Sequence, residues 1–281
     1  GIKGDPALLK KVAEGWKANR EKISTWKGKA LLYDSDYDPG EEKNPVKVRV
    51  EFAYSRELGA KRWNWEYQDV PIETNRMVKD NRYYTYRAQT PVHAQVAPEG
   101  PRNLFIEARE EKRRASPMGD EFPLHYMGPR GYNIFKEMSF YASIHDSPKT
   151  TGTVRKIDDK VILETGKRWS QRYEFDVSQG CNCTLHRIET PGHMEEWKAE
   201  YTEIDGVFVP KWVRYINQEE GREERGMKDI DEREVQFLNH RVNEPLGPDE
   251  FTLESLGLQK GDIIYNHIKG TRRPYPGPDS E

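Results

Sequence analysis

Three neighbouring residues, His193, Glu195 and Glu196, form the densest group in the sequence that could do chemistry. On a strand, His193 and Glu195 point to the same side, so an imidazole and a carboxylate there could share a proton or a metal ion. The group directly follows Pro191-Gly192, a turn signal, and we favour the interpretation of a solvated hairpin edge. A metal-dependent hydrolase built on these three residues stays an alternative.

No other motif predicts catalysis or a bound cofactor. The remaining histidines are scattered and form neither His-x-x-x-His nor His-Glu-x-x-His, the spacings that place two metal ligands on one helix face. The sequence contains no Gly-x-Ser-x-Gly for a nucleophilic serine and no glycine-rich phosphate loop. We therefore expect a non-enzymatic protein with no catalytic residues, no metal site and no cofactor.

The two cysteines, Cys181 and Cys183, are one residue apart. Side chains at alternate strand positions point the same way but lie too far apart for an unstrained disulfide, so we expect two free thiols. A structural metal site would need further ligands, and the chain has no second pair of cysteines. The cysteines therefore do not indicate the compartment in which the protein works.

Rows of aromatic residues are the other candidate site. Trp63, Trp65 and Tyr67 alternate with polar residues, and further aromatics recur in this way between residues 167 and 242. Three interpretations are open: an ordinary core, a cavity for an acyl chain or another apolar ligand, and an exposed platform for stacking on sugars. The candidate cavity residues are Trp63, Trp65, Tyr67, Tyr173, Phe175, Trp197, Tyr201 and Phe237.

The same alternation predicts the strands that would position these aromatics. A period of two is typical of half-buried antiparallel strands with one apolar face and one wet face. Such a sheet leaves a broad apolar face that a helix, a second sheet or a ligand must cover. The predicted strands are 26–33, 45–56, 61–68, 76–79, 82–87, 153–157, 161–165, 168–177, 184–189, 195–204, 208–218 and 225–242.

Helices are predicted where they could cover that face. Asp5-Pro6 is a typical helix start, and apolar residues at helical spacing continue to Ile23. A second, shorter helix is predicted over 132–144, and a short helical turn over 247–258. The prediction of these helices does not decide whether their side chains fill the space over the aromatic face or leave room there for a ligand.

Two segments break the strand series. Residues 89–131 contain six prolines and the charged run 107–114, and they are interpreted as a long excursion with a short helix rather than a series of strands. The end of the chain, 270–281, is rich in Pro, Gly and charge and is predicted to fray. We expect one domain over 1–270, followed by a frayed tail at 271–281.

Composition excludes some functions. The net charge of −3 arises from 45 basic and 48 acidic residues. This balance gives no excess of positive charge that would indicate binding to nucleic acid or to an anionic membrane. Aromatics make up 11% of the chain, which excludes a disordered profile despite 33% charged residues. No stretch approaches the ~20 apolar residues of a transmembrane helix. The first residue is Gly rather than Met, which is compatible with a removed export signal.

Three strings and the order of elements resemble a known family. The strings are Ile23–Ala30 after the first helix, Tyr201–Lys211 in a late hairpin and Asn243–Leu253 near the end. Together with an N-terminal helix followed by a meander of long strands, they resemble the larger exported relatives of the LolA/LolB-like lipoprotein-carrier superfamily. The resemblance spans most of the chain, and its strings are structural rather than catalytic.

The resemblance implies both a fold and a function. The implied fold is α+β and mainly antiparallel β, with a strongly curved, unclosed-barrel sheet wrapping the N-terminal helix and the short internal helices. The implied function is an exported, periplasmic protein that holds lipid or lipoprotein acyl chains in an apolar cavity. The chain departs from the carriers in its length, and no position matches their cavity-gating arginine. The alternative from a different class is a structural or sensor domain that binds a protein or peptide at a sheet edge or along 89–131.

Overall fold

The computed structural model describes residues 1–34, 46–67, 72–79, 82–89, 103–108, 127, 134–144, 146–147, 149–166, 169–221 and 230–278. Side chains are described at these positions except 34, 46–47, 65–67, 72–76, 78–79, 82–89 and 103–108. The chain divides into two compact units. Unit 1 comprises 1–23, 32–45 and 123–237, and unit 2 comprises 24–31, 46–122 and 238–281.

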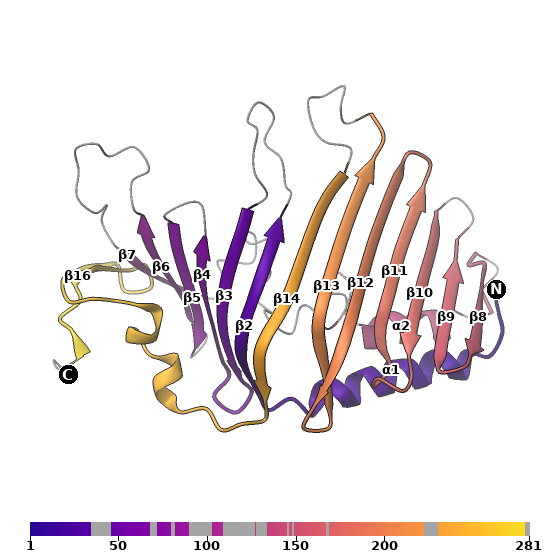
Figure 1. The fold of residues 1–281 in the computed structure, drawn as a ribbon, viewed down its shortest axis with the longest axis horizontal. Helices are drawn as coiled ribbons and strands as arrows, with labels where there is room; N and C mark the ends of the chain where they lie inside the picture. The colour runs from indigo at the N-terminus through magenta and orange to yellow at the C-terminus, as the bar shows by residue number, and fades with distance from the viewer. Residues whose placement is uncertain are drawn as a thin grey trace. The chain divides into compact units, whose positions relative to one another are not determined.

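Unit 1 is a sheet with two helices (Figure 1). The helices are α1 (Pro6–Glu21) and α2 (Ile134–Ser143), both where the sequence predicted them. Asp5 caps α1 as predicted, because its side chain accepts a hydrogen bond from Ala7 N at 2.8 Å. The strands are β1 (Ile2–Lys3), β8 (Gly152–Ile157), β9 (Lys160–Thr165), β10 (Ser170–Asp176), β11 (Asn182–Thr190), β12 (His193–Ile204), β13 (Val207–Glu219) and β14 (Ile230–Val242).

The strands of unit 1 are hydrogen-bonded in the order β1-β8-β9-β10-β11-β12-β13-β14. The pairs from β8 to β14 are antiparallel, and the added strand β1 pairs parallel with β8. The turn between β12 and β13 contains Asp205 and Gly206, both with positive φ of 51° and 70°. Such a pair of positive φ angles matches the twist of a two-residue hairpin loop, for which Asp-Gly is a favoured sequence.

The two helices cover one face of this sheet, which we call the inner face. Figure 1 shows α1 lying across β8 to β13 with α2 beside it, and α1 contacts β8, β9, β11, β13 and α2. Apolar side chains of both helices are buried against the strands, because each helix presents one apolar stripe to the sheet. These side chains are Leu9, Val12, Ala13, Trp16, Ile134 and Met138.

Unit 2 contains β2 (Thr25–Asp34), β3 (Val46–Ser55), β4 (Ala60–Tyr67), β5 (Ile72–Lys79), β6 (Arg82–Gln89), β7 (Asn103–Ala108), β15 (Ile263–Asn266) and β16 (Thr271–Pro274). They are hydrogen-bonded in this order, and β2 and β14 each have residues in both units. The pairings from β3 to β7 and the pair β15–β16 are antiparallel, whereas β15 pairs parallel with β7. The hairpins β3–β4 and β5–β6 are built from the predicted strands 45–56, 61–68, 76–79 and 82–87.

The sheet of unit 2 carries a C-terminal cover on one face. Short 3-10 helices at Pro248–Phe251 and Glu254–Leu256 occupy the predicted helical turn. Phe251, Leu256, Leu258, Ile264 and Tyr275 form one buried cluster with Ala53, Ala60 and Met77 of the strands. The C-terminal segment is therefore part of the core of this unit.

Two sequence predictions are corrected here. Residues 103–108 form strand β7, although no strand was assigned to the excursion at 89–131. Leu104, Phe105 and Ile106 favour a strand, and the parallel partner β15 lies far along the chain. The tail predicted to fray contains β16, and Tyr275 is buried. The rest of the excursion, except Met127, and its predicted short helix lie outside the described residues.

The predicted fold class is confirmed. The structure is α+β with a mainly antiparallel sheet that does not close, because β1 and β16 stand at opposite ends of the strand order. The expectation of a single domain over 1–270 stays a prediction. Within the described residues, no helix is both long and apolar enough to cross a membrane.

Candidate functional site

The eight candidate aromatics are divided between the two units. Tyr173, Phe175, Trp197, Tyr201 and Phe237 belong to unit 1, whereas Trp63, Trp65 and Tyr67 lie on β4 in unit 2. The side chains of Trp65 and Tyr67 lie outside the described residues. Of the other six, all except the half-buried Tyr201 are buried. The eight residues therefore form no single site among the described side chains, and unit 1 contains five of the six candidates whose side chains are described.

Five rings in unit 1 follow one another from the surface into the core, and we call them the ring row. Phe140 of α2, 56% exposed, lies 5.7 Å from Tyr141 between ring centroids. Tyr141 lies 6.3 Å from Tyr173, which stacks on His186 at 4.2 Å and on Phe175 at 5.9 Å. Because Phe175 is fully buried, the row connects an exposed helix side chain to the interior.

Two polar contacts join α2 to the inner face beside the ring row. The Tyr173 hydroxyl donates a hydrogen bond to the carboxyl of Glu137 on α2. The Tyr141 hydroxyl donates to the side-chain oxygen of Gln171 on β10 at 2.8 Å. Burial raises the pKa of Glu137 and outweighs the opposing effect of the Tyr173 bond. Burial and the neighbouring Glu137 also raise the pKa of Tyr173, so its hydroxyl keeps its proton.

The remaining candidates of unit 1 fill the core around this row. Trp197 is the cross-strand neighbour of His186, and the Tyr201 hydroxyl donates to the carbonyl oxygen of Cys183 at 2.9 Å. Cys181 and Cys183 are both free and buried. Burial raises the pKa of the Cys183 thiol well above its usual value, so this sulfur is not an activated nucleophile.

In unit 2, Trp63 shares the aromatic face of the sheet with Phe52 and Trp26. Trp63 pairs with Phe52 across β3 and β4, and Phe52 meets Trp26 edge-on at 5.7 Å. The indole Nε1 of Trp26 donates to Nδ1 of His240 at 3.4 Å. All three aromatic side chains are almost completely buried, which is typical of a packed core.

The His193 group separates into two parts. His193 and Glu195 share one face as predicted, and their side chains contact at 3.1 Å. Glu196 points to the opposite face, where it pairs with Arg187 and Lys198, so the proposed three-residue site is wrong. Burial would raise the pKa of Glu196, but hydrogen bonds from Lys198 and Arg187 outweigh it and lower that pKa. No group of three or more potential metal ligands occurs in the part of the chain that the structure describes.

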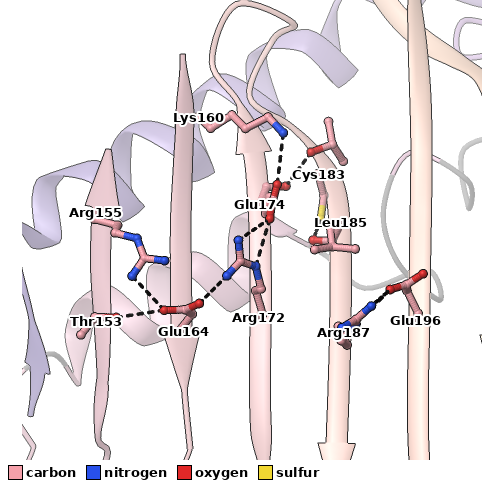
Figure 2. A network of polar contacts seen from close by, with 11 residues as sticks. Thr153, Arg155, Lys160, Glu164, Arg172, Glu174, Cys183, Leu185, Arg187 and Glu196 are labelled. Carbon is pink, nitrogen blue, oxygen red and sulfur yellow. Dashed lines mark hydrogen bonds and ion pairs between the residues drawn. The ribbon is translucent and has the colours of Figure 1, made fainter. Parts of the chain in front are cut away.

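Glu196 belongs to a series of ion pairs on the outer face of unit 1, opposite the helices. Figure 2 shows Arg155 and Arg172 on either side of Glu164, at 3.0 and 2.5 Å. Arg172 and Lys160 both contact Glu174, at 2.6 and 3.2 Å. Arginine and glutamate alternate across neighbouring strands, so most of the charge is neutralised within the series. This face is therefore the wet face that the alternation predicted.

Two hollows are lined by described residues, one in each unit. A hollow of about 470 Å³ in unit 2 is lined mostly by polar and charged side chains, including the ion-paired Lys27 and Glu250. A hollow of about 660 Å³ in unit 1 includes Glu164, Arg172 and Arg187 of the outer face. None of the eight candidate aromatics lines either hollow. Both linings are too polar for a cavity that holds an acyl chain.

Sequence reasoning identified only Tyr173 and Phe175 of the ring row and missed its other three rings, together with Glu137 and Gln171 of its polar contacts. Glu137 carries no sequence signal, because it is a single carboxylate on an amphipathic helix. Tyr141 lies in the helix predicted over 132–144, but its partner Gln171 on β10 has no local sequence signal. His186 becomes a neighbour of Tyr173 only through the register of β10 and β11, which a single sequence does not reveal.

Comparisons with known proteins give a fold-level likeness at low similarity. No family model and no curated protein matches the chain. A DUF1329 family protein from Desulfovibrio piger is 9% identical, with a TM-score of 0.42, and the alignment covers 90% of this chain and 100% of that one. A LolA superfamily protein from Nitrosomonas europaea is 9% identical, with a TM-score of 0.41 and coverages of 87% and 97%. Identity and TM-score are both too low for these likenesses to support an inference about function.

Proposed function

We propose that this chain is a non-enzymatic protein that binds an apolar chain, such as a lipid or lipoprotein acyl chain, between α2 and the inner face of unit 1. The observation that carries this proposal is the ring row. Its rings run from the exposed Phe140 through Tyr141 and Tyr173 to the buried Phe175, and the hydroxyls of the two tyrosines are hydrogen-bonded to Gln171 and Glu137. A methylene chain that enters beside Phe140 contacts an aromatic surface along its whole length.

Binding requires α2 to move, because Tyr173 and Phe175 are closely packed in this structure. The movement separates the Tyr173–Glu137 and Tyr141–Gln171 hydrogen bonds, at a cost of about 1 kcal/mol each. Association itself costs at least ~4 kcal/mol. Burial of a methylene group contributes ~0.8 kcal/mol, so a chain of about ten methylenes exceeds these costs together. Long acyl chains are therefore the ligands that fit the proposal.

A displacement assay tests the proposal. Diphenylhexatriene, a neutral apolar probe, is bound to the purified chain and then displaced with 1-dodecanol below its solubility limit in water. We expect dodecanol to displace the probe from the wild-type chain. We expect Phe140→Asp to bind dodecanol about tenfold more weakly, because a carboxylate at the entrance opposes an apolar ligand. Ile157→Asp is the matched control, since Ile157 is also apolar, 49% exposed and in unit 1, but lies outside the ring row.

Two results contradict the proposal. One is the absence of any probe or dodecanol binding together with a lipid-free organic extract of the purified protein. The other is equal weakening by Phe140→Asp and Ile157→Asp, which indicates non-specific apolar adsorption rather than entry along the ring row.

Export to the periplasm is also part of the proposal. It is supported by the resemblance of the strings Ile23–Ala30, Tyr201–Lys211 and Asn243–Leu253 to exported lipoprotein carriers. Fractionation of the source cells, followed by detection of the protein with an antibody, tests it. Recovery with cytoplasmic markers contradicts an exported carrier, whereas recovery with periplasmic markers supports it.

A further inference from the structure

The carboxyl group of Glu137 lies against the ring row, and only one of its two oxygens has a hydrogen-bond partner among the described residues. Tyr173 donates to Oε1, while Oε2 is buried and has no hydrogen-bond partner among the described residues. A buried acceptor without a donor costs about 1–3 kcal/mol, so such groups in native proteins are usually paired with a donor from the protein, a water molecule or a ligand. Oε2 is therefore an acceptor that a bound molecule can satisfy.

The surroundings of Glu137 lack a cation among the described contacts. Tyr173 of β10 contacts it directly, and Cys183 and His186 of β11 lie beside Tyr173 in the same core. Lys17 of α1 is directed at the ring of Phe135 and at Glu21, and Lys136 of α2 is exposed. Burial without a described cationic partner raises the pKa of Glu137.

We propose that Glu137 selects the polar head of the ligand, so that an alkyl chain ending in a hydrogen-bond donor, above all an amine, binds in preference to the same chain ending in a carboxylate. This inference rests on the proposed function. An ammonium or hydroxyl head beside Tyr173 donates to Oε2 and satisfies the buried acceptor. A carboxylate head brings a second acceptor and a second negative charge to the same place, and like charges at this distance oppose each other.

The preference depends on pH through Glu137. When Glu137 is ionised, it attracts an ammonium head and repels a carboxylate. When it is protonated, its own O–H can donate to a carboxylate, so the preference shrinks. The preference for the amine therefore grows as pH rises through the elevated pKa of Glu137.

The experiment compares three probes of equal chain length, dodecylamine, 1-dodecanol and dodecanoate, by displacement of diphenylhexatriene at pH 5 and pH 8. We expect dodecylamine to bind at least about tenfold more tightly than dodecanoate at pH 8, with a smaller ratio at pH 5. In Glu137→Gln the ratio falls towards one, while dodecanol binding changes less than about twofold. Glu14→Gln, the same change at an exposed position of α1, keeps the wild-type ratio.

The outcomes separate the two proposals. If none of the three probes displaces diphenylhexatriene, the apolar-chain function fails. If all three bind and the ratio is the same in Glu137→Gln and wild type, the head-group inference is overturned while the apolar-chain function stands. If Glu137→Gln does not fold, the affinities of the wild-type chain test the inference. A ratio of dodecylamine to dodecanoate affinity near one at pH 8 overturns it.

Discussion

The hydroxyl of Tyr173 donates a hydrogen bond to the carboxyl of Glu137 and so joins the centre of the sheet to the helix that covers it. The two residues are 36 positions apart in sequence, and neither is exposed. This bond and the Tyr141–Gln171 bond are the described polar contacts that separate when α2 moves away from β10. The stability of α2 on the sheet is therefore linked to the protonation and partners of one carboxyl group.

Tyr173→Phe is expected to lower the free energy of unfolding by about 1–3 kcal/mol, because it removes the donor and leaves both oxygens of Glu137 buried without a partner. Urea denaturation followed by tryptophan fluorescence measures this loss. Tyr33→Phe, the same change at a half-buried residue of β2, is the control and is expected to cost less. Equal losses in the two variants would show that the hydroxyl of Tyr173 does not hold α2.

The raised pKa of Glu137 gives a pH dependence of definite sign. The folded state holds the proton more tightly than the unfolded state, so this residue makes stability fall as pH rises from the unfolded pKa through the folded one. In Glu137→Gln this decline disappears, and the variant gains stability relative to wild type as pH rises from about 4.5. Unfolding curves at intervals between pH 4 and pH 8 measure the difference, and parallel profiles for the two proteins would contradict it.

His240 in unit 2 is expected to act in the opposite direction. Burial lowers its pKa, and Nδ1 accepts a hydrogen bond from Trp26, which requires this nitrogen to be unprotonated. Stability from His240 is therefore present above its unfolded pKa and is lost as pH falls through that value towards the folded pKa. His240→Asn keeps an acceptor without a titrating group, so we expect it to lose less stability than wild type between pH 7.5 and pH 5. A steeper loss in the variant would overturn this assignment.

Arg62 and Arg155 offer a test of buried against exposed ion pairs. The side chain of Arg62 is 5% exposed and contacts Glu51, Glu250 and the Ser255 carbonyl oxygen at 3.1–3.3 Å. Arg62→Met is expected to cost about 3 kcal/mol, because it removes a buried guanidinium that donates to Glu250 and to the Ser255 carbonyl oxygen. Arg155→Met, on the exposed outer face, is expected to cost under about 1 kcal/mol. Thermal and urea unfolding of both variants measure the difference, and similar costs would contradict it.

The local pattern of the sequence determined the strands, their two faces and the helices that cover one of them. Alternation with period two fixes the direction of successive side chains within one strand, so Arg172 and Glu174 could be assigned to the face opposite Tyr173 and Phe175. The same rule placed His193 with Glu195, and it also separates Glu196 from them. The cap at Asp5 and the Asp205-Gly206 turn are similarly local, because their hydrogen bonds and dihedral angles involve near neighbours.

Only the tertiary structure decided which distant residues meet. The Tyr173–Glu137 bond, the stacking of Tyr173 on His186 and the parallel pair β7–β15 depend on strand register and helix position, which one sequence does not encode in any local period. The same holds for the C-terminal segment, whose polar composition predicted a frayed tail. Tyr275 of this tail is buried because it lies in one cluster with Phe251, Leu256 and small or apolar side chains of the unit 2 strands. The sequence thus determined that an aromatic face needed a cover, and the tertiary structure decided that a buried carboxyl group on that cover faces the ring row.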